Sequence, residues 1–208
     1  MKREQHLNII IEETDRLTQI VNDMLDLSKL ESGAQKLDYS TFDIAQCMAE
    51  IVHRYEGVSE RMGYQIHLTL DEPCMVRCDE SKIDRVIGNL INNAINYTSK
   101  EDKQVFVTQR NLPQCVRIEV RDTGDGIEED KIKLIFDKYY RSENHKREVV
   151  GTGLGLSIVK EILKMHNYNY GVNSKLGEGS TFWFEIRDIV PPEKPEDEEI
   201  PDAEIRQL

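Results

Sequence analysis

The chain has 208 residues, 38% hydrophobic and 32% charged, which is enough for one substantial core with appendages or for two small domains. Its formal net charge of −12 argues against broad binding to nucleic acids or anionic membranes, because such binding needs clustered Lys and Arg. No apolar stretch approaches the roughly 18 residues that span a bilayer, and no signal peptide is evident.

The first 33 residues predict one long helix. Apolar or small side chains recur at alternating steps of three and four residues from Leu7 to Ser28, as in helices that pack side by side. Gly33 ends the pattern, because glycine suits a helix C-terminus. The apolar seam either pairs with another chain or lies on this chain's own core, and its length favours intermolecular pairing.

The next segment predicts short strands and one helix. An extended piece around Leu37–Tyr39 precedes a predicted helix from Asp43 to about Arg61. Alternation then predicts a strand over Tyr64–Leu70 and a second over Met75–Cys78, paired with the first through a turn at Asp71–Pro73.

A further helix is predicted over Glu80–Tyr97, with Asp79 as its N-cap. Val105–Arg110 and Cys115–Arg121 predict a hairpin, and Thr181–Ile186 a final strand. With no regular βαβ repeat, the pattern indicates an α+β fold of helices and mainly antiparallel strands.

The last 20 residues and the cysteines have separate implications. Residues 189–208 carry seven acidic side chains, two basic ones and four of the six prolines, which predicts a disordered tail.

Cys47, Cys74, Cys78 and Cys115 form no Cys-x-x-Cys pair, so free thiols are favoured. Cys74 and Cys78 would share one strand face, which leaves a disulfide or half a zinc site as the alternative.

A row of asparagines lies beside the apolar stripe of the predicted Glu80–Tyr97 helix. Asn89 and Asn93 fall on adjacent turns, followed by Asn96 or Tyr97. Amide oxygens can ligate Mg²⁺, which shares its coordination sphere with substrate phosphates. A solvated polar helix face is the alternative interpretation.

Asp122 follows an apolar strand and precedes Gly124 and Gly126, where glycine lets the backbone turn sharply. A buried carboxylate there can accept a hydrogen bond from the exocyclic amino group of adenine, whereas guanine presents a carbonyl. The arrangement therefore favours ATP over GTP. Taken alone, the run is more typical of a plain surface turn.

A second glycine run, Gly151–Gly155 with glycine at alternate positions, opens a predicted helix from Leu156. A helix N-terminus directs free N–H groups and a positive dipole end at an anion, which predicts a phosphate site. The spacing fits neither Gly-x-Gly-x-x-Gly nor a P-loop. The basic stretch Ser142–Glu148 fits either a loop that closes over a triphosphate or an ordinary exposed loop.

Together these runs resemble the motifs of sensor histidine kinases of two-component systems, within the superfamily of ATP-binding domains that includes gyrase, Hsp90 and MutL proteins. Five boxes occur in the family's order: Asn89–Tyr97, Asp122–Gly126, Phe136–Arg141, Gly151–Leu156 and Gly177–Phe182. The resemblance covers about residues 36 to 187. It implies a two-layer α/β sandwich of the Bergerat type, a mixed sheet covered on one face by helices, preceded by a coiled-coil-like helix.

The resemblance implies a site for ATP and Mg²⁺, with Asn93 as the metal ligand and Asp122 reading the adenine amino group. The residues expected to contact the nucleotide are Asn89, Asn93, Tyr97, Asp122, Gly124, Gly126, Tyr140, Arg141, Lys146, Arg147, Gly151, Thr152, Gly153, Leu154, Gly155, Leu156 and Thr181. Asn96 departs from the family, which usually has Lys or Arg there, so a phosphate contact is either lost or supplied by the basic loop.

The N-terminal helix resembles the second helix of the family's dimerisation and histidine-phosphotransfer domain. The phosphoacceptor box, a His followed by an acidic residue and a Pro, is missing, and His6 lacks that context. We therefore expect part of a longer kinase that does not phosphorylate itself. Its divisions would be residues 1–33 (the partial phosphotransfer domain), 34–188 (the catalytic ATP-binding domain) and 189–208 (the tail).

The implied function is transfer of the γ-phosphoryl group of Mg-ATP to a histidine-bearing helix of the same kinase or of its dimer partner, with a response regulator as a further partner. The expected location is the cytoplasm, with any membrane anchor upstream. The alternative is a non-catalytic module whose lid responds to nucleotide. An ATPase of the gyrase or MutL kind is disfavoured, because the asparagine helix offers no Glu as general base near Asn93.

Overall fold

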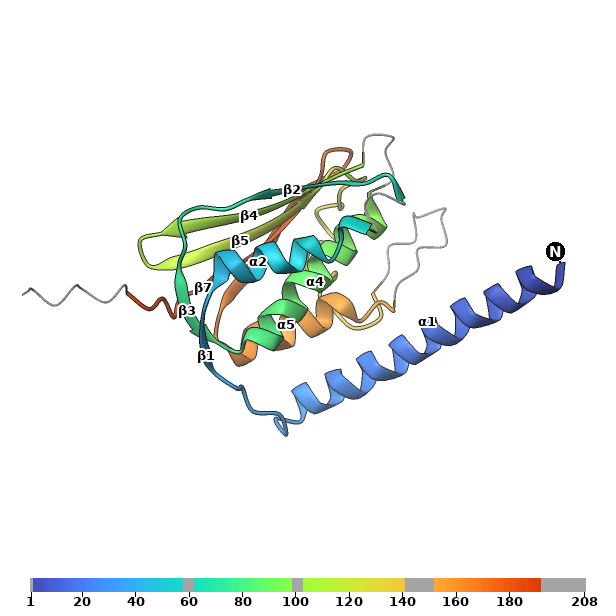
Figure 1. Cartoon of the computed structure of the whole chain (residues 1–208), viewed down its shortest axis with the longest axis horizontal. Helices are drawn as coiled ribbons and strands as arrows, with labels where there is room; N and C mark the ends of the chain where they lie inside the picture. The colour runs from blue at the N-terminus through green and yellow to red at the C-terminus, as the bar shows by residue number, and fades with distance from the viewer. Residues whose placement is uncertain (1, 58–61, 99–102, 141–151, 192–208) are drawn as a thin grey trace, which may run out of the picture.

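The computed structural model describes residues 2–57, 62–98, 103–140 and 152–191. A long helix, α1 (Lys2–Glu31), projects from an α+β domain in which helices cover one face of a sheet (Figure 1). The expected fold class is therefore confirmed. None of the described helices combines the length and apolar character that crossing a bilayer demands.

The main sheet is mixed and has five strands in the order β2-β4-β5-β7-β6. β2 pairs with β4 in parallel, and the remaining neighbours are antiparallel. The strands are β2 (Gln65–Thr69), β4 (Gln104–Leu112), β5 (Cys115–Asp122), β6 (Asn169–Lys175) and β7 (Gly179–Ile186). A separate two-stranded sheet joins β1 (Ser40–Asp43) to β3 (Met75–Cys78).

Three helices, α2 (Ile44–His53), α4 (Glu80–Tyr97) and α5 (Gly155–Met165), cover one face of the main sheet (Figure 1). The apolar stripe of α4 is buried, as its helical spacing predicts, and it meets the inward side chains of the sheet. On β5 these inward residues are Val116, Ile118 and Val120, each fully buried. The helices bury this face of the sheet, and the end of β5 and the start of β7 lie next to α4, where a pocket forms.

The predicted pairing of the Met75–Cys78 strand with the preceding strand was wrong. β3 pairs with β1, and β2 lies beside β4. The connecting turn does not reverse into a hairpin because its groups bind the β4–β5 hairpin instead. The backbone N–H of Asn111 donates to Asp71 at 2.8 Å, and the Asn111 side-chain amide donates to the carbonyl of Glu72 at 2.8 Å.

Two further elements differ from the sequence prediction. α2 ends at His53, and after two turn residues the chain is helical again at Glu56 and Gly57, so the helix predicted from Asp43 to about Arg61 is interrupted at residues 54–55. Residues 58–61 of that prediction lie outside the described residues. Strand β6 was not predicted, because it is an edge strand with polar residues and a glycine and lacks clear alternation. Its Gly171 lies against the ring of Trp183 on β7, where a Cβ would come within 2.7 Å of the indole.

The N-terminus of α4 is tied to the C-terminus of α5 through one buried histidine. Asp79 caps α4 by accepting the N–H of Lys82 at 3.1 Å. The backbone N–H of Asp79 donates to Nε2 of His166 at 3.2 Å, so Nε2 is unprotonated, and Nδ1 donates to the carbonyl of Ile162 at 2.9 Å. Both ring nitrogens are thus used by a neutral imidazole.

Among the described side chains of α1, only those in its last turns are buried in the domain core. Leu27 and Leu30 are buried, whereas seven large apolar side chains of this helix are 46 to 61% exposed: Leu7, Ile10, Ile11, Leu17, Val21, Met24 and Leu25. The expected pairing of this seam with another chain stays a prediction. At the other end of the described chain, the N–H of Val190 donates to the carbonyl of Met75 in β3. The predicted disorder of the tail falls largely on residues outside those described.

Acidification should destabilise the domain through His166. Burial lowers the pKa of His166 below its ordinary value of 6.5, so unfolding takes up a proton. Stability that is present above pH 6.5 is therefore lost as the pH falls through the lower pKa of the folded state. The melting temperature, followed from about pH 8 down to about pH 5, should decline more steeply for the native chain than for His166→Gln. Equal slopes would contradict this assignment.

Candidate functional site

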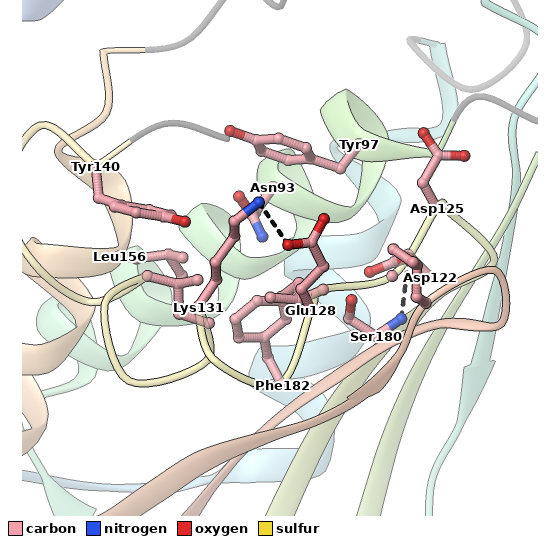
Figure 2. A pocket seen from close by; sticks show the side chains of 14 residues that line it. Asn93, Tyr97, Asp122, Asp125, Glu128, Lys131, Tyr140, Leu156, Ser180 and Phe182 are labelled. Carbon is pink, nitrogen blue, oxygen red and sulfur yellow. Dashed lines mark hydrogen bonds and ion pairs between the residues drawn. The ribbon is translucent and has the colours of Figure 1, made fainter. Parts of the chain in front are cut away.

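One pocket lies between α4, the end of β5, the loop that follows β5, and β7 (Figure 2). It encloses about 820 Å³ of empty space, counting the part open to solvent. It is lined by Asn93, Tyr97, Asp122, Asp125, Gly126, Ile127, Glu128, Lys131, Ile135, Tyr140, Leu156, Leu176, Ser180 and Phe182. Apolar walls with a few placed polar groups are typical of small-molecule sites.

Asp122, the last residue of β5, is the fixed polar group of the pocket. Its side chain is 3% exposed, and its Oδ1 accepts the backbone N–H of Gly124 at 2.8 Å and of Ser180 at 3.2 Å. These bonds hold the carboxylate in one orientation at the pocket wall (Figure 2). A carboxylate held in this way can accept a further hydrogen bond from a ligand amino group.

One glycine of the first run, Gly126, and one at the start of β7, Gly179, allow the backbone to close around Asp122. Gly126 has φ +72°, and a Cβ there would lie 2.1 Å from the carbonyl oxygen of Lys175. Gly179 has φ +96°, and its Cβ would lie 2.2 Å from the carbonyl oxygen of Asp122. The post-β5 loop and the β6–β7 hairpin therefore cross at a separation that excludes side chains.

The second glycine run leads to a helix end suited to an anion. α5 begins at Gly155, and its N-cap residue, Leu154, makes no side-chain capping bond. Asn89 lies alongside: its Oδ1 is 3.7 Å from the position of a Cβ on Gly155. Its Nδ2 is buried and has no hydrogen-bond partner within the described part of the chain. A buried donor without a partner beside an uncapped helix N-terminus fits a phosphate group.

The predicted site residues separate into three groups. Asn93, Tyr97, Asp122, Gly126, Tyr140 and Leu156 line the pocket. Asn89, Gly124, Thr152, Gly153, Leu154, Gly155 and Thr181 are not among the lining residues. Arg141, Lys146, Arg147 and Gly151 lie outside the described residues, so the structure does not bear on the expected basic loop.

Ser180, and not the predicted Thr181, lines the pocket. Alternation along β7 places Ser180 and Phe182 on the buried face, and Thr181 on the other. Seven further lining residues are absent from the predicted list: Asp125, Ile127, Glu128, Lys131, Ile135, Leu176 and Phe182. Asp125 and Phe182 fall within the boxes Asp122–Gly126 and Gly177–Phe182, whereas no local pattern marks Glu128, Lys131, Ile135 or Leu176. Their place in the site depends on how the loop after β5 folds against α4 and β7.

The second glycine run is also bonded to α1. The hydroxyl of Thr152 donates to Oδ2 of Asp23 at 3.0 Å, and accepts the N–H of Leu154 at 3.2 Å. Arg85 of α4 donates to Asp23 at 3.2 Å and to Asp26 at 2.5 Å. Asp23, which is 7% exposed, thus joins the N-terminal helix to the approach to α5.

Residues 78–189 match the family described as histidine kinase-, DNA gyrase B- and HSP90-like ATPase, and residues 1–33 match the His kinase A (phospho-acceptor) domain. The sensor protein kinase WalK of Staphylococcus saprophyticus is 34% identical over 185 residues, covering 88% of this chain and 30% of the relative. The chain thus spans about 30% of the length of such curated relatives.

Two solved structures share the fold at 25% identity. ShkA, full-length and in complex with AMPPNP, has a TM-score of 0.80 over 92% of this chain and 40% of that one. The histidine kinase ThkA in complex with the response regulator protein TrrA has a TM-score of 0.70 over 88% of this chain and 50% of that one.

Alanine at Gly126 should destabilise the domain more than alanine at Gly177. Both glycines have positive φ, +72° and +82°, so each substitution carries roughly 1–2 kcal/mol of backbone strain. Only at Gly126 does the new Cβ meet backbone, which adds about 1–3 kcal/mol of overpacking, since nothing lies within 4 Å of a Cβ on Gly177. Urea unfolding of both variants measures the difference, and equal losses would show that the crossing is not tight.

Proposed function

The chain belongs to the sensor histidine kinases and contains their ATPase-type catalytic domain, and from this premise we propose that it binds Mg-ATP and donates the γ-phosphoryl group to a histidine. The observation that carries the proposal is one pocket with complementary ends. A fixed carboxylate, Asp122, lies at one end, and the uncapped start of α5 adjoins the other beside Asn89.

Asp122 would determine which base is bound. Its carboxylate accepts hydrogen bonds only, so it suits the amino group of adenine and opposes the carbonyl of guanine. Apolar walls, including Ile127, Ile135 and Phe182, would hold a flat base, and Tyr97 closes the pocket on the side of α4 (Figure 2). Phe182 is itself supported by Phe136, whose ring lies edge-on at 6.3 Å between centroids.

Asn93 is the residue suited to Mg²⁺. It is a lining residue on the same face of α4 as Asn89, and an amide oxygen is a ligand that Mg²⁺ accepts alongside phosphates and water. When bound, the ion would neutralise part of the phosphate charge. Phosphoryl transfer depends mainly on such positioning and charge neutralisation. Asn89 would donate its buried amide to the phosphates.

The acceptor histidine is proposed to lie on another helix of the full-length kinase. None of the five histidines here is followed by an acidic residue and a proline, and both nitrogens of His166 are already bonded within the core. The exposed apolar residues of α1 suit pairing with that helix and with a second subunit. We further propose that the kinase acts in the cytoplasm and that the phosphoryl group passes from its histidine to a response regulator.

A regulatory module is the second candidate, and the bond between Thr152 and Asp23 favours it. Through that bond α1 is joined to the glycine run that precedes α5, so nucleotide occupancy would alter how α1 is held. In this reading ATP binding changes partner docking without phosphoryl transfer. The two candidates share one nucleotide site and differ only in chemistry.

Substitutions at Asp122 and Asn93 should weaken ATP binding in distinguishable ways. Asp122→Asn places an amide donor opposite the adenine amino group and should cost roughly tenfold or more in affinity with or without Mg²⁺. Asn93→Ala should remove the stimulation of binding by Mg²⁺ and leave binding in EDTA nearly unchanged. Titration with a fluorescent ATP analogue measures both. Asn96→Ala, an exposed change on the same helix, is the matched control. Native binding by both site variants would refute the assignment.

Phosphoryl transfer itself is testable in trans. The chain, incubated with γ-labelled ATP and a separately supplied histidine-bearing helix segment of the same kinase, should label that segment with an acid-labile phosphate. Without the segment, the chain should remain unlabelled. ATP binding with no transfer to the segment would instead support the regulatory module.

A further inference from the structure

Lys131 is the single cation among the described residues that line the pocket, which also holds three carboxylates, Asp122, Asp125 and Glu128. Figure 2 shows its side chain extending to the carboxylate of Glu128 among the residues that line the pocket. Its neighbour Lys133 is exposed and does not line the pocket. A phosphate chain entering this site therefore meets one cation, Lys131, and three carboxylates that repel it.

The turns of the backbone after Glu128 place the side chain of Lys131 at the pocket. The segment after Glu128 is a series of tight turns, in which the N–H of Lys131 donates to the carbonyl of Glu128 at 3.0 Å and that of Leu134 to the carbonyl of Lys131 at 2.8 Å. Residues three apart overlie one another in such turns, so Lys131 and Glu128 lie side by side at the pocket. Their ammonium and carboxylate are 2.7 Å apart.

The ion pair is one that a phosphate can replace. The side chains of Lys131 and Glu128 are 28% and 35% exposed, and ion pairs open to solvent contribute little to stability. The hydrogen bond with Glu128 raises the pKa of Lys131, which keeps the ammonium charged. A multiply charged phosphate chain is a stronger acceptor than one carboxylate, and the long side chain can rotate between the two.

We propose that Lys131 leaves Glu128 and binds the phosphate chain of the adenine nucleotide, as a phosphate-positioning residue on the wall that faces α4. This inference rests on the proposed function, ATP binding at the pocket. Lys131 would also supply a cation at the pocket that α4 does not, since Asn93 and Tyr97 are the residues of α4 that line it. Glu128 would then hold the ammonium in place while no nucleotide is bound.

The test compares ligands that differ only in phosphate number. The affinities of adenosine, AMP, ADP and ATP are measured by calorimetry or fluorescence competition for the native chain, Lys131→Gln and Lys131→Arg. Lys131→Gln should weaken ADP and ATP about tenfold or more and leave adenosine unchanged, since bonds to charged groups are worth this much. Lys131→Arg should recover most of the loss. Lys133→Gln, which removes an equal charge outside the pocket, should bind all four ligands normally.

Equal weakening of adenosine and ATP by Lys131→Gln would overturn the proposal, because Lys131 would then support the pocket wall. Unchanged affinity for all ligands would overturn it as well. Glu128→Gln separates the two partners: it should tighten ADP binding by freeing the ammonium, and a loss like that of Lys131→Gln would show that the pair acts as one structural unit. Failure of the native chain to bind ATP at all would instead refute the proposed function.

Discussion

The site depends on the two hydrogen bonds that the carboxylate of Asp122 accepts from backbone N–H groups. Gly124 follows Asp122 in the chain and Ser180 lies 58 residues beyond it, so one side chain joins the loop after β5 to the start of β7. The close crossings at Gly126 and Gly179 make this junction tight. Because the same carboxylate is proposed to read adenine, the group that organises the pocket is also the group that would select its ligand.

Two buried polar residues, His166 and Asp23, hold the helices around that junction. His166 fixes the C-terminal end of α5 against the N-terminal end of α4. The opposite ends of these two helices carry the pocket residues Asn93, Tyr97 and Leu156. Asp23 of α1 bonds Thr152 and Arg85, so the N-terminal helix contacts the run that precedes α5. A change in how α1 pairs with other helices therefore has a direct physical route to the proposed phosphate end of the pocket.

The charge balance of the pocket sets a constraint on any anionic ligand. Three carboxylates and one cation, Lys131, line the described wall, and Lys131 is paired with one of the three, Glu128. The buried amide of Asn89 adds a neutral donor beside α5. A site of this composition suits a nucleotide whose phosphates arrive partly neutralised by a divalent cation. The pairing of Lys131 with Glu128 also keeps a charge available in the pocket at little cost to the fold.

Local sequence patterns determined the helices of the domain, the β4–β5 hairpin, and the order of asparagine and glycine boxes that place Asn93, Tyr97 and Asp122 in one pocket. Periodicity and glycine spacing are properties of neighbouring residues, so they can be recognised without coordinates. Only the tertiary structure decided that β3 pairs with β1, that β6 forms one edge of the main sheet, and that Lys131 lines the pocket. These features follow from contacts between segments far apart in the chain, or from a turn whose direction is set by such contacts, and no local period encodes them.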